Sequence, residues 1–201
     1  MSEKKNNHIV WHDGYVTRRE RIASYGHKSG LVWFTGFSAS GKSTIAHNLE
    51  RLLFNNGIKV YALDGDNIRY GLNSDLGFSP EDRRENLRRI AEVARLFVDA
   101  GIIVLAAFIS PYKKDREFVR SKFDEGDFIE VYVRCPVEIC EQRDPKGQYK
   151  KARQGLIKGY TGVDAPYEEP EDPELILDTS RLSIEESVIK VYEYLKAKGW
   201  F

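Results

Sequence analysis

Residues 31–44 read LVWFTGFSASGKST, and this stretch decides the fold. Its first five residues form an apolar run, which predicts a buried strand. The residues from Gly36 to Ser43 then satisfy the phosphate-binding pattern G-x-x-x-x-G-K-[ST]. After this loop, apolar residues recur at helical spacing from Ile45 to Leu53. A strand, a glycine-containing loop and a helix in this order predict a nucleotide site of the P-loop type.

The loop supplies the chemistry expected at the phosphates of ATP. Successive backbone N–H groups point at phosphate oxygens, and the helix N-terminus adds partial positive charge. Lys42 is expected to reach the β- and γ-phosphates, and the Ser43 hydroxyl to ligate Mg²⁺. Ala39 stands where many such loops carry glycine, so we expect local tightening from one added methyl group. The predicted ATP-binding residues of the loop are Gly36, Ser38, Ala39, Ser40, Gly41, Lys42, Ser43 and Thr44.

Further apolar runs alternate with amphipathic segments along the rest of the chain. This alternation predicts an α/β fold, a doubly wound parallel β-sheet with helices on both faces. Ligands of such a sheet bind at the carboxyl ends of its strands. We expect strands at 58–63, 102–109, 128–133 and 175–177, and helices that begin at Ser79-Pro80, near residue 112 and at Ser183.

The chain divides into an arm and one domain. Residues 1–30 are polar and irregular, and we expect them to lie on the domain or on a partner subunit. Residues 31–201 are predicted to form a single P-loop kinase domain. Within that domain, residues from about 145 to 173 are rich in Lys, Gly, Pro and Tyr and lack apolar periodicity, which is typical of a lid.

Composition excludes several classes of protein. Lys plus Arg and Asp plus Glu both number 31, so the charge gives no reason to expect nucleic acid or a membrane as partner. No apolar run is long enough to span a bilayer. Cys135 and Cys140 imply no disulfide framework, and the first residues do not resemble a signal peptide. We therefore expect a cytoplasmic protein.

Two carboxylates follow the second predicted strand. A kinase needs a group that orients and deprotonates the attacking hydroxyl, and Asp66 is our candidate for it. Asp64 is the second choice, or an outer partner of Mg²⁺, and an Asx-type turn is the purely structural alternative. The chain has no clear guanine-reading Asn-Lys-x-Asp sequence, and the strand at 102–109 lacks a terminal Asp. These features favour small-molecule phosphotransfer over a GTP switch or a motor ATPase.

Basic side chains gather before the long helix and in the lid. Most should be solvated charges, but an acceptor with its own anionic group needs some of them, and arginine can bind two oxygens at once. Phe78 and Tyr160 lie beside these cations, so a base stacked between two rings would fit, as would ordinary packing. The basic residues are Arg69, Arg83, Arg84, Lys146, Lys150, Lys151, Arg153 and Lys158.

Several blocks in the right order carry a family resemblance. They are residues 33–36 leading into 40–44, then 63–69, 76–79, 82–86, 107–112, 143–147, 149–153, 159–162 and 166–168. With them the chain, from about Asn6 to its C-terminus, closely resembles the adenylyl-sulfate kinases. These enzymes phosphorylate adenosine 5′-phosphosulfate (APS) at its 3′-hydroxyl and give 3′-phosphoadenosine 5′-phosphosulfate (PAPS). Two departures are Tyr160, where many relatives have Phe, and the loop's Gly36-Phe37-Ser38-Ala39, where Gly-Leu-Ser-Gly is usual.

The resemblance implies ATP and APS as substrates, Mg²⁺ as cofactor and a homodimer that serves sulfate assimilation. It implies that Asp66 lies near the attacking hydroxyl and that Phe78 and Tyr160 sandwich the adenine of APS. It also implies, more weakly, that Arg143 and Thr179 lie on the adenine side of ATP. The implied substrate-binding residues are Asp66, Asn67, Arg69, Phe78, Arg83, Asn86, Ile109, Ser110, Lys146, Gly159 and Tyr160, of which Arg83 and Asn86 would bind the sulfate or phosphate end.

Ser110 has a disputed role. The family's usual description makes this serine a phosphoserine intermediate. Direct transfer between a donor and an acceptor held in line needs no covalent intermediate, so we expect Ser110 to form part of the binding pocket instead. Ser110 stays in the candidate catalytic set with Lys42 and Asp66, because it ends a strand at the expected site.

Two other functions remain open. The first is a P-loop kinase for a nucleoside, sugar or shikimate-like acceptor, against which the paired aromatic residues and the 108–111 block argue. The second is a nucleotide-gated regulator or an inactive subunit. Intact Lys42, Ser43 and Asp66 argue against that reading.

Overall fold

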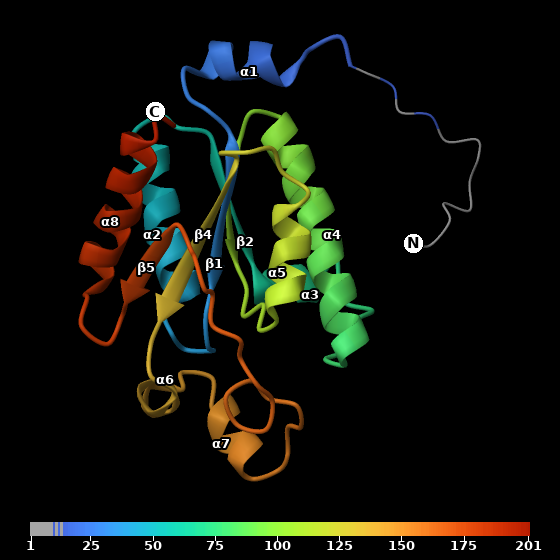
Figure 1. Cartoon of the computed structure of the whole chain (residues 1–201), viewed down its shortest axis with the longest axis vertical. Coiled ribbons are helices and arrows are strands. Elements are labelled where there is room, and N and C mark those ends of the chain that lie inside the picture. The colour runs from blue at the N-terminus through green and yellow to red at the C-terminus, as the bar shows by residue number, and fades with distance from the viewer. Residues whose placement is uncertain (1–9, 11, 13) are drawn as a thin grey trace.

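A five-stranded sheet forms the centre of the computed structural model, which describes residues 10, 12 and 14–201 (Figure 1). All four strand pairings are parallel, in the order β2-β3-β1-β4-β5. This arrangement confirms the predicted fold class. The remaining residues of the predicted arm, 1–9, 11 and 13, lie outside the described part of the chain. The strands are β1 (Gly30–Thr35), β2 (Val60–Asp64), β3 (Ile103–Ala107), β4 (Phe128–Arg134) and β5 (Leu175–Asp178).

Helices cover both faces of the sheet (Figure 1). Side chains alternate between the two faces along a strand. In β1, Phe34 therefore packs in the cluster that includes Leu49 and Leu195, whereas Trp33 packs in the cluster that includes Ile90. The helices are α1 (Arg18–Tyr25), α2 (Lys42–Asn55), α3 (Gly65–Tyr70), α4 (Pro80–Asp99), α5 (Lys113–Arg120), α6 (Val137–Arg143), α7 (Gln148–Arg153) and α8 (Ile184–Ala197).

Two predicted helix starts are confirmed. The Ser79 side chain accepts a hydrogen bond from the backbone N–H of Asp82, and Pro80 is the first residue of α4. At α8, the side chains of Ser183 and Glu186 form a reciprocal capping box. Each cap satisfies backbone N–H groups that the first helical turn would otherwise leave unpaired.

The expectation of an irregular segment up to residue 30 is wrong for residues 18–25, which form α1. Thr17 and Glu20 form a capping box at its start. Arg18 then fixes the helix to the domain, because its guanidinium bonds to the Ser29 side chain at 2.8 Å and forms an ion pair with Asp127. In Figure 1, α1 lies at the amino ends of the strands, opposite α6 and α7.

The predicted lid also contains regular structure. Residues 148–153 form α7, and Ala152 and Tyr149 of this helix are buried in a small cluster with Tyr160. The lid lies beyond the carboxyl ends of the strands (Figure 1).

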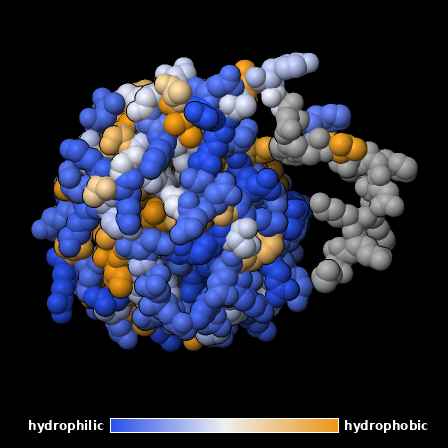
Figure 2. Space-filling view, turned by 45° about the horizontal axis from the view of Figure 1, so that its top comes forward, coloured by the Kyte–Doolittle hydropathy of each residue, from blue (hydrophilic) through white to orange (hydrophobic). Residues whose placement is uncertain are grey.

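The outer surface is mostly hydrophilic. On the face shown in Figure 2, hydrophobic residues form small patches scattered among polar ones. Within the described residues, no helix combines the length and the apolar character that a membrane crossing requires.

Candidate active site

A cavity of about 1200 Å³ opens at the carboxyl ends of the strands. The phosphate loop, the ends of β2 and β3, α4, the lid and the start of α8 all contribute to its wall. Small-molecule sites usually measure about 300–1,000 Å³. The cavity is therefore large enough to hold a donor and an acceptor together.

The backbone of the phosphate loop adopts several left-handed conformations. Gly36 has φ +146°, and a Cβ atom there would collide with the carbonyl oxygen of Val133 in β4. Gly41, at φ +103°, leads directly into α2. Ala39 has φ 59°, which costs a residue with a side chain about 1–2 kcal/mol. The cost of Ala39 is thus backbone strain as well as the extra methyl group that the sequence indicated.

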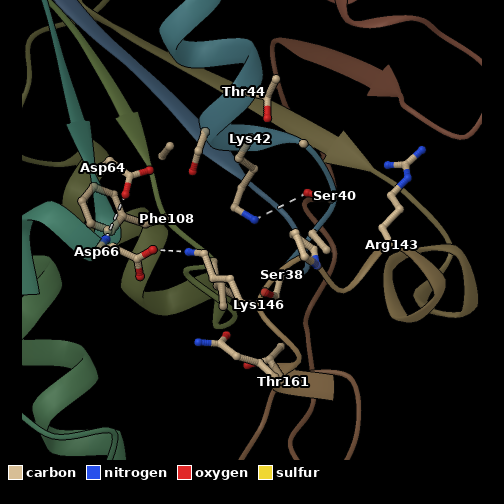
Figure 3. A pocket seen from close by; sticks show the side chains of 18 of the residues that line it. Ser38, Ser40, Lys42, Thr44, Asp64, Asp66, Phe108, Arg143, Lys146 and Thr161 are labelled. Carbon is tan, nitrogen blue, oxygen red and sulfur yellow. Dashed lines mark hydrogen bonds and ion pairs between the residues drawn. The ribbon is translucent and has the colours of Figure 1, made fainter. Parts of the chain in front are cut away.

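Lys42 is held inside the loop. Its Nζ donates to the carbonyl oxygens of Gly36 at 2.9 Å and Phe37 at 2.5 Å, and to Ser40 Oγ at 3.5 Å (Figure 3). The residue is only 7% exposed, and burial lowers the pKa of Lys42 to about 8. The nearby carboxylate of Asp64 acts in the opposite direction. An anionic phosphate would be a stronger partner for this cation than the carbonyl groups are.

The two candidate carboxylates differ in their surroundings. Asp64 is the N-cap of α3, because its Oδ1 accepts from the backbone N–H of Asp66 at 3.0 Å. The Asx-type turn considered from the sequence therefore exists, and Asp64 still lines the cavity. Asp66 is mostly exposed and forms an ion pair with Lys146 of the lid (Figure 3).

Two arginines hold the region around Phe78. Arg69 donates to the carbonyl of Gly77 at 2.9 Å, and its guanidinium lies 4.4 Å from the centre of the Phe78 ring. Burial lowers the pKa of Arg69. Arg83 donates to the carbonyls of Phe78 at 3.0 Å and Gly159 at 2.9 Å, so it connects α4 with the lid.

The two rings predicted to sandwich adenine differ in their exposure to solvent. Phe78 is 65% exposed, whereas Tyr160 is 8% exposed. Tyr160 packs edge-on against Tyr149, with ring centres 5.0 Å apart. The hydroxyl of Tyr149 donates to the Ser38 carbonyl at 3.1 Å. Tyr149 therefore joins the lid to the phosphate loop.

Ser110 ends the segment after β3 in a strained conformation, with φ 41°. Its hydroxyl accepts from Trp33 Nε1 at 3.0 Å and donates to Thr35 Oγ1 at 2.9 Å. Its carbonyl accepts from Arg116 at 2.8 Å. The residue is 2% exposed, and these two hydrogen bonds hold its hydroxyl at the cavity wall.

Arg143 and Thr179 come together beside the loop. Arg143 donates to the Thr179 carbonyl at 2.6 Å, and Thr179 Oγ1 donates to the Ser40 carbonyl at 2.8 Å. Leu182 and Ile184, before and within α8, line the same cavity as Arg143 and Thr179.

Comparison with known proteins decides the family. A family model described as adenylylsulphate kinase matches residues 28–178. The adenylyl-sulfate kinase of Staphylococcus epidermidis is 59% identical over 196 residues, which cover 98% of each chain. That of Staphylococcus carnosus is 58% identical over 192 residues, which cover 96% of each. The chain belongs to the adenylyl-sulfate kinase family.

Solved structures agree with this assignment. The adenylyl-sulfate kinase (APS kinase) CysC of Mycobacterium tuberculosis, solved in complex with AMPPNP and APS, matches with a TM-score of 0.81 and 48% identity. The match covers 85% of this chain and 99% of that one. The family and the P-loop kinase fold are thus confirmed, and the chain is an ATP-dependent kinase, as its sequence predicts.

Most of the predicted site residues line the same cavity. Three of them do not. Two of these three contact lining residues through their backbone carbonyls: the Gly36 carbonyl accepts a hydrogen bond from Lys42, and the Gly159 carbonyl accepts one from Arg83. Asn67, the third, is exposed on α3. The residues that line the cavity are Ser38, Ala39, Ser40, Gly41, Lys42, Ser43, Thr44, Asp64, Asp66, Arg69, Phe78, Arg83, Asn86, Ile109, Ser110, Arg143, Lys146, Tyr160 and Thr179.

One buried cation behind the site was missed. Arg116 is 3% exposed and donates to the carbonyls of Ser110 and Glu168, both at 2.8 Å. It also forms an ion pair with Glu130 at 2.9 Å. Arg116 therefore ties the cavity wall at Ser110 to the end of the lid. Nothing in its charged sequence context distinguishes it from a solvated residue.

Proposed function

We propose that this chain transfers the γ-phosphoryl group of ATP to the 3′-hydroxyl of APS, giving PAPS and ADP. The observation that carries the proposal is that Lys42 of the phosphate loop and Asp66 of the acceptor side line one cavity. The cavity volume of about 1200 Å³ accommodates both substrates. Membership of the adenylyl-sulfate kinase family supports this particular acceptor.

On the donor side, the loop would bind the phosphates of ATP. The N–H groups at the start of α2 and the Lys42 ammonium would stabilise the charge that spreads over the transferred group. Lys42 would exchange its contacts with loop carbonyls for phosphate oxygens. Arg143 and Thr179 would lie beside the adenine of ATP, next to the start of α8.

The cofactor would be Mg²⁺, held by the hydroxyl of Ser43 and the carboxylate of Asp64. Both are oxygen donors of the kind that Mg²⁺ prefers, and both line the cavity. Among the described residues, no group of three or more His, Cys, Asp or Glu side chains could hold a metal ion. The nucleotide's phosphates would supply the further ligands. The bound ion neutralises charge on those phosphates.

On the acceptor side, Asp66 would accept the proton of the 3′-hydroxyl as that oxygen attacks the γ-phosphorus. Asp66 is available for this because its side chain is exposed to the cavity and its present partner, Lys146, comes from the lid. Phe78 and Tyr160 would contact the adenine of APS. Arg83 and Asn86 would bind its anionic end.

Ser110 would shape the pocket rather than carry a phosphoryl group. Its hydroxyl already takes part in two hydrogen bonds, with Trp33 and Thr35. A phosphorylated hydroxyl would have to abandon the bond donated to Thr35. Direct in-line transfer avoids that disruption.

We further propose a cytoplasmic homodimer that binds neither nucleic acid nor membrane. The balanced charge of the chain supports the absence of polyanionic partners. The homodimer is an expectation from the family resemblance. Light scattering of the purified protein tests it, and a monomer at working concentration would contradict it.

The deciding experiment is an assay of the purified protein with Mg-ATP and a panel of acceptors. We expect PAPS and ADP to form in equal amounts from APS, with no product from gluconate, shikimate or adenosine. Preference for a sugar or nucleoside would support another small-molecule kinase. ADP release without any phosphorylated acceptor would support a nucleotide-gated regulator instead.

A further inference from the structure

Asn73 is a buried polar residue that the mechanism above does not use. It lies in the loop between α3 and α4 and has no exposed surface. Its backbone N–H donates to the Ile68 carbonyl at 2.9 Å, and its carbonyl accepts from the N–H of Leu76 at 3.1 Å. Both backbone groups are therefore occupied, and only the side-chain amide is left to reach a neighbour.

That amide contacts the acceptor wall of the cavity. Asn73 Nδ2 donates to Oδ1 of Asn86 at 2.9 Å. Asn86 is buried and lines the cavity, three residues after Arg83 in α4. Residues three apart lie on the same side of a helix. The Asn73–Asn86 pair therefore stands directly behind the part of the wall that carries Arg83.

The pair leaves one end of the Asn86 amide free. An asparagine side chain has one oxygen that accepts and one nitrogen that donates. Asn73 occupies the oxygen, while Nδ2 of Asn86 has no hydrogen-bond partner among the described residues. We propose that Asn73 is a positioning residue, which turns the Nδ2 group of Asn86 toward the anionic end of the acceptor. This inference rests on the site proposed above for APS.

A second observation supports a directed role. Oδ1 of Asn73 is buried and unpaired within the described part of the chain. Buried polar atoms almost always have a partner, so a residue that only stabilised the loop would not be expected to leave one unsatisfied. The loop itself is already held by Arg69, which donates to the carbonyls of Leu76 and Gly77. The Asn73 side chain is thus not needed to close the loop.

The reverse orientation would harm the proposed site. If Asn86 presented its oxygen to the cavity, two acceptors would face each other when an anionic group bound. The donor orientation instead adds a hydrogen bond beside the positive charge of Arg83, and bonds of this kind to charged groups are the stronger ones. Asn73 would therefore affect selection of an acceptor that carries an anionic end.

The test is Asn73→Asp, which keeps the shape of the side chain and, at a pH where the new carboxyl group is ionised, offers only acceptor oxygens. The Asn86 amide must then turn its Nδ2 toward position 73 and its oxygen toward the cavity. The readout is the ratio of the dissociation constants of adenosine and APS, measured by calorimetry without ATP, since adenosine lacks the anionic end. We expect the ratio to fall at least about tenfold, with the affinity for AMPPNP unchanged. An unchanged ratio overturns the inference.

Asn86→Ala separates this inference from the site on which it rests. If Asn86→Ala leaves the ratio as it is, the proposed site assignment fails, and the inference with it. If Asn86→Ala lowers the ratio but Asn73→Asp does not, the inference alone fails. In the double variant, Asn73→Ala should add nothing to Asn86→Ala, because it brings no charge of its own and a residue that acts through Asn86 has no effect without it. Additive effects contradict the inference.

Two further variants guard against misfolding and general effects. Asn56→Asp is the matched control, because Asn56 Nδ2 donates to the Leu52 carbonyl at 2.8 Å at the end of α2, outside the cavity lining. Its ratio should equal that of the unchanged protein. If Asn73→Asp does not fold, Asn73→Ala replaces it. That variant frees the Asn86 amide to take both orientations, so the ratio should fall about twofold or more, and a ratio equal to that of Asn56→Asp overturns the inference.

Discussion

Lys146 of the lid and Asp66 of α3 form an ion pair that joins the two sides of the cavity (Figure 3). Both side chains are more than half exposed, so the pair contributes at most about 1 kcal/mol to stability. It holds the lid toward α3 while leaving the carboxylate easy to release. In the proposed mechanism, the acceptor hydroxyl would therefore compete with a lysine of the lid for Asp66.

Asp66→Asn should lower kcat by at least about a hundredfold, because the amide cannot accept the hydroxyl proton. Affinity for an ATP analogue should change little, since Asp66 lies on the acceptor side. Steady-state kinetics with APS provide the measurement. Asp75→Asn is the control, because Asp75 pairs with Arg89 outside the cavity lining. Near-normal turnover of Asp66→Asn would remove Asp66 from the mechanism.

Lys42→Ala should lower kcat/KM by at least about a hundredfold, equivalent to roughly 2.7 kcal/mol of lost transition-state stabilisation. The physical reason is that Lys42 is the only loop residue whose side chain would place a positive charge at the phosphates. Lys190→Ala, on the exposed side of α8, should leave kcat/KM unchanged. An unaffected rate in Lys42→Ala contradicts the assignment of the loop.

Binding of an ATP analogue should weaken as pH rises above 8. The free protein holds Lys42 with a pKa of about 8, and the phosphates need its charged form. Above that pH, binding must take up a proton, so the dissociation constant should rise roughly tenfold between pH 7.5 and 9. Calorimetry in buffers of different ionisation enthalpy measures the number of protons taken up when the ATP analogue binds. Lys42→Arg stays charged throughout, so its affinity should lose this pH dependence.

The same group acts on the stability of the protein without nucleotide. Unfolded, Lys42 keeps its proton up to about its ordinary pKa of 10.5, whereas the folded protein releases it near pH 8. Between these values the unfolded chain binds more protons. The contribution of Lys42 to the free energy of unfolding therefore rises with pH across this window.

Ser110→Ala should retain turnover, with kcat within about tenfold of the unchanged protein. The variant leaves Trp33 Nε1 without its partner, which should lower stability by about 1–3 kcal/mol. Thermal unfolding measures that loss. Incubation of the unchanged protein with γ-labelled ATP should leave no label on the protein. Complete loss of turnover together with a labelled enzyme would establish the covalent route instead.

Much of the fold follows from local sequence. The apolar run at 31–35, the caps at Ser79 and Ser183, and the glycine-containing loop each specify a structure that nearby residues suffice to form. The start of helix α1 could also have been predicted, because Thr17 and Glu20 have capping-box spacing. However, α1 has no buried residue, so its sequence lacks the apolar periodicity that usually indicates a helix.

What the sequence did not indicate depends on contacts between distant segments. Arg116 is buried because Glu130, on a different element, neutralises it. The engagement of the Ser110 hydroxyl depends on Trp33 and Thr35, more than 70 positions away. A single sequence carries no record of such pairings. The residues of the loop could be named in advance, but their inward-facing lysine and strained alanine could not.

Gly36 has a consequence for protein engineering. Its missing side chain makes room for the carbonyl oxygen of Val133, which belongs to the neighbouring strand β4. The first glycine of the loop is thus required by the sheet before any nucleotide arrives. A grafted copy of residues 36–43 would need a host whose adjacent strand runs parallel and approaches equally closely. The loop therefore cannot be transferred by itself. A graft would have to include the β1–β4 pair together with α2.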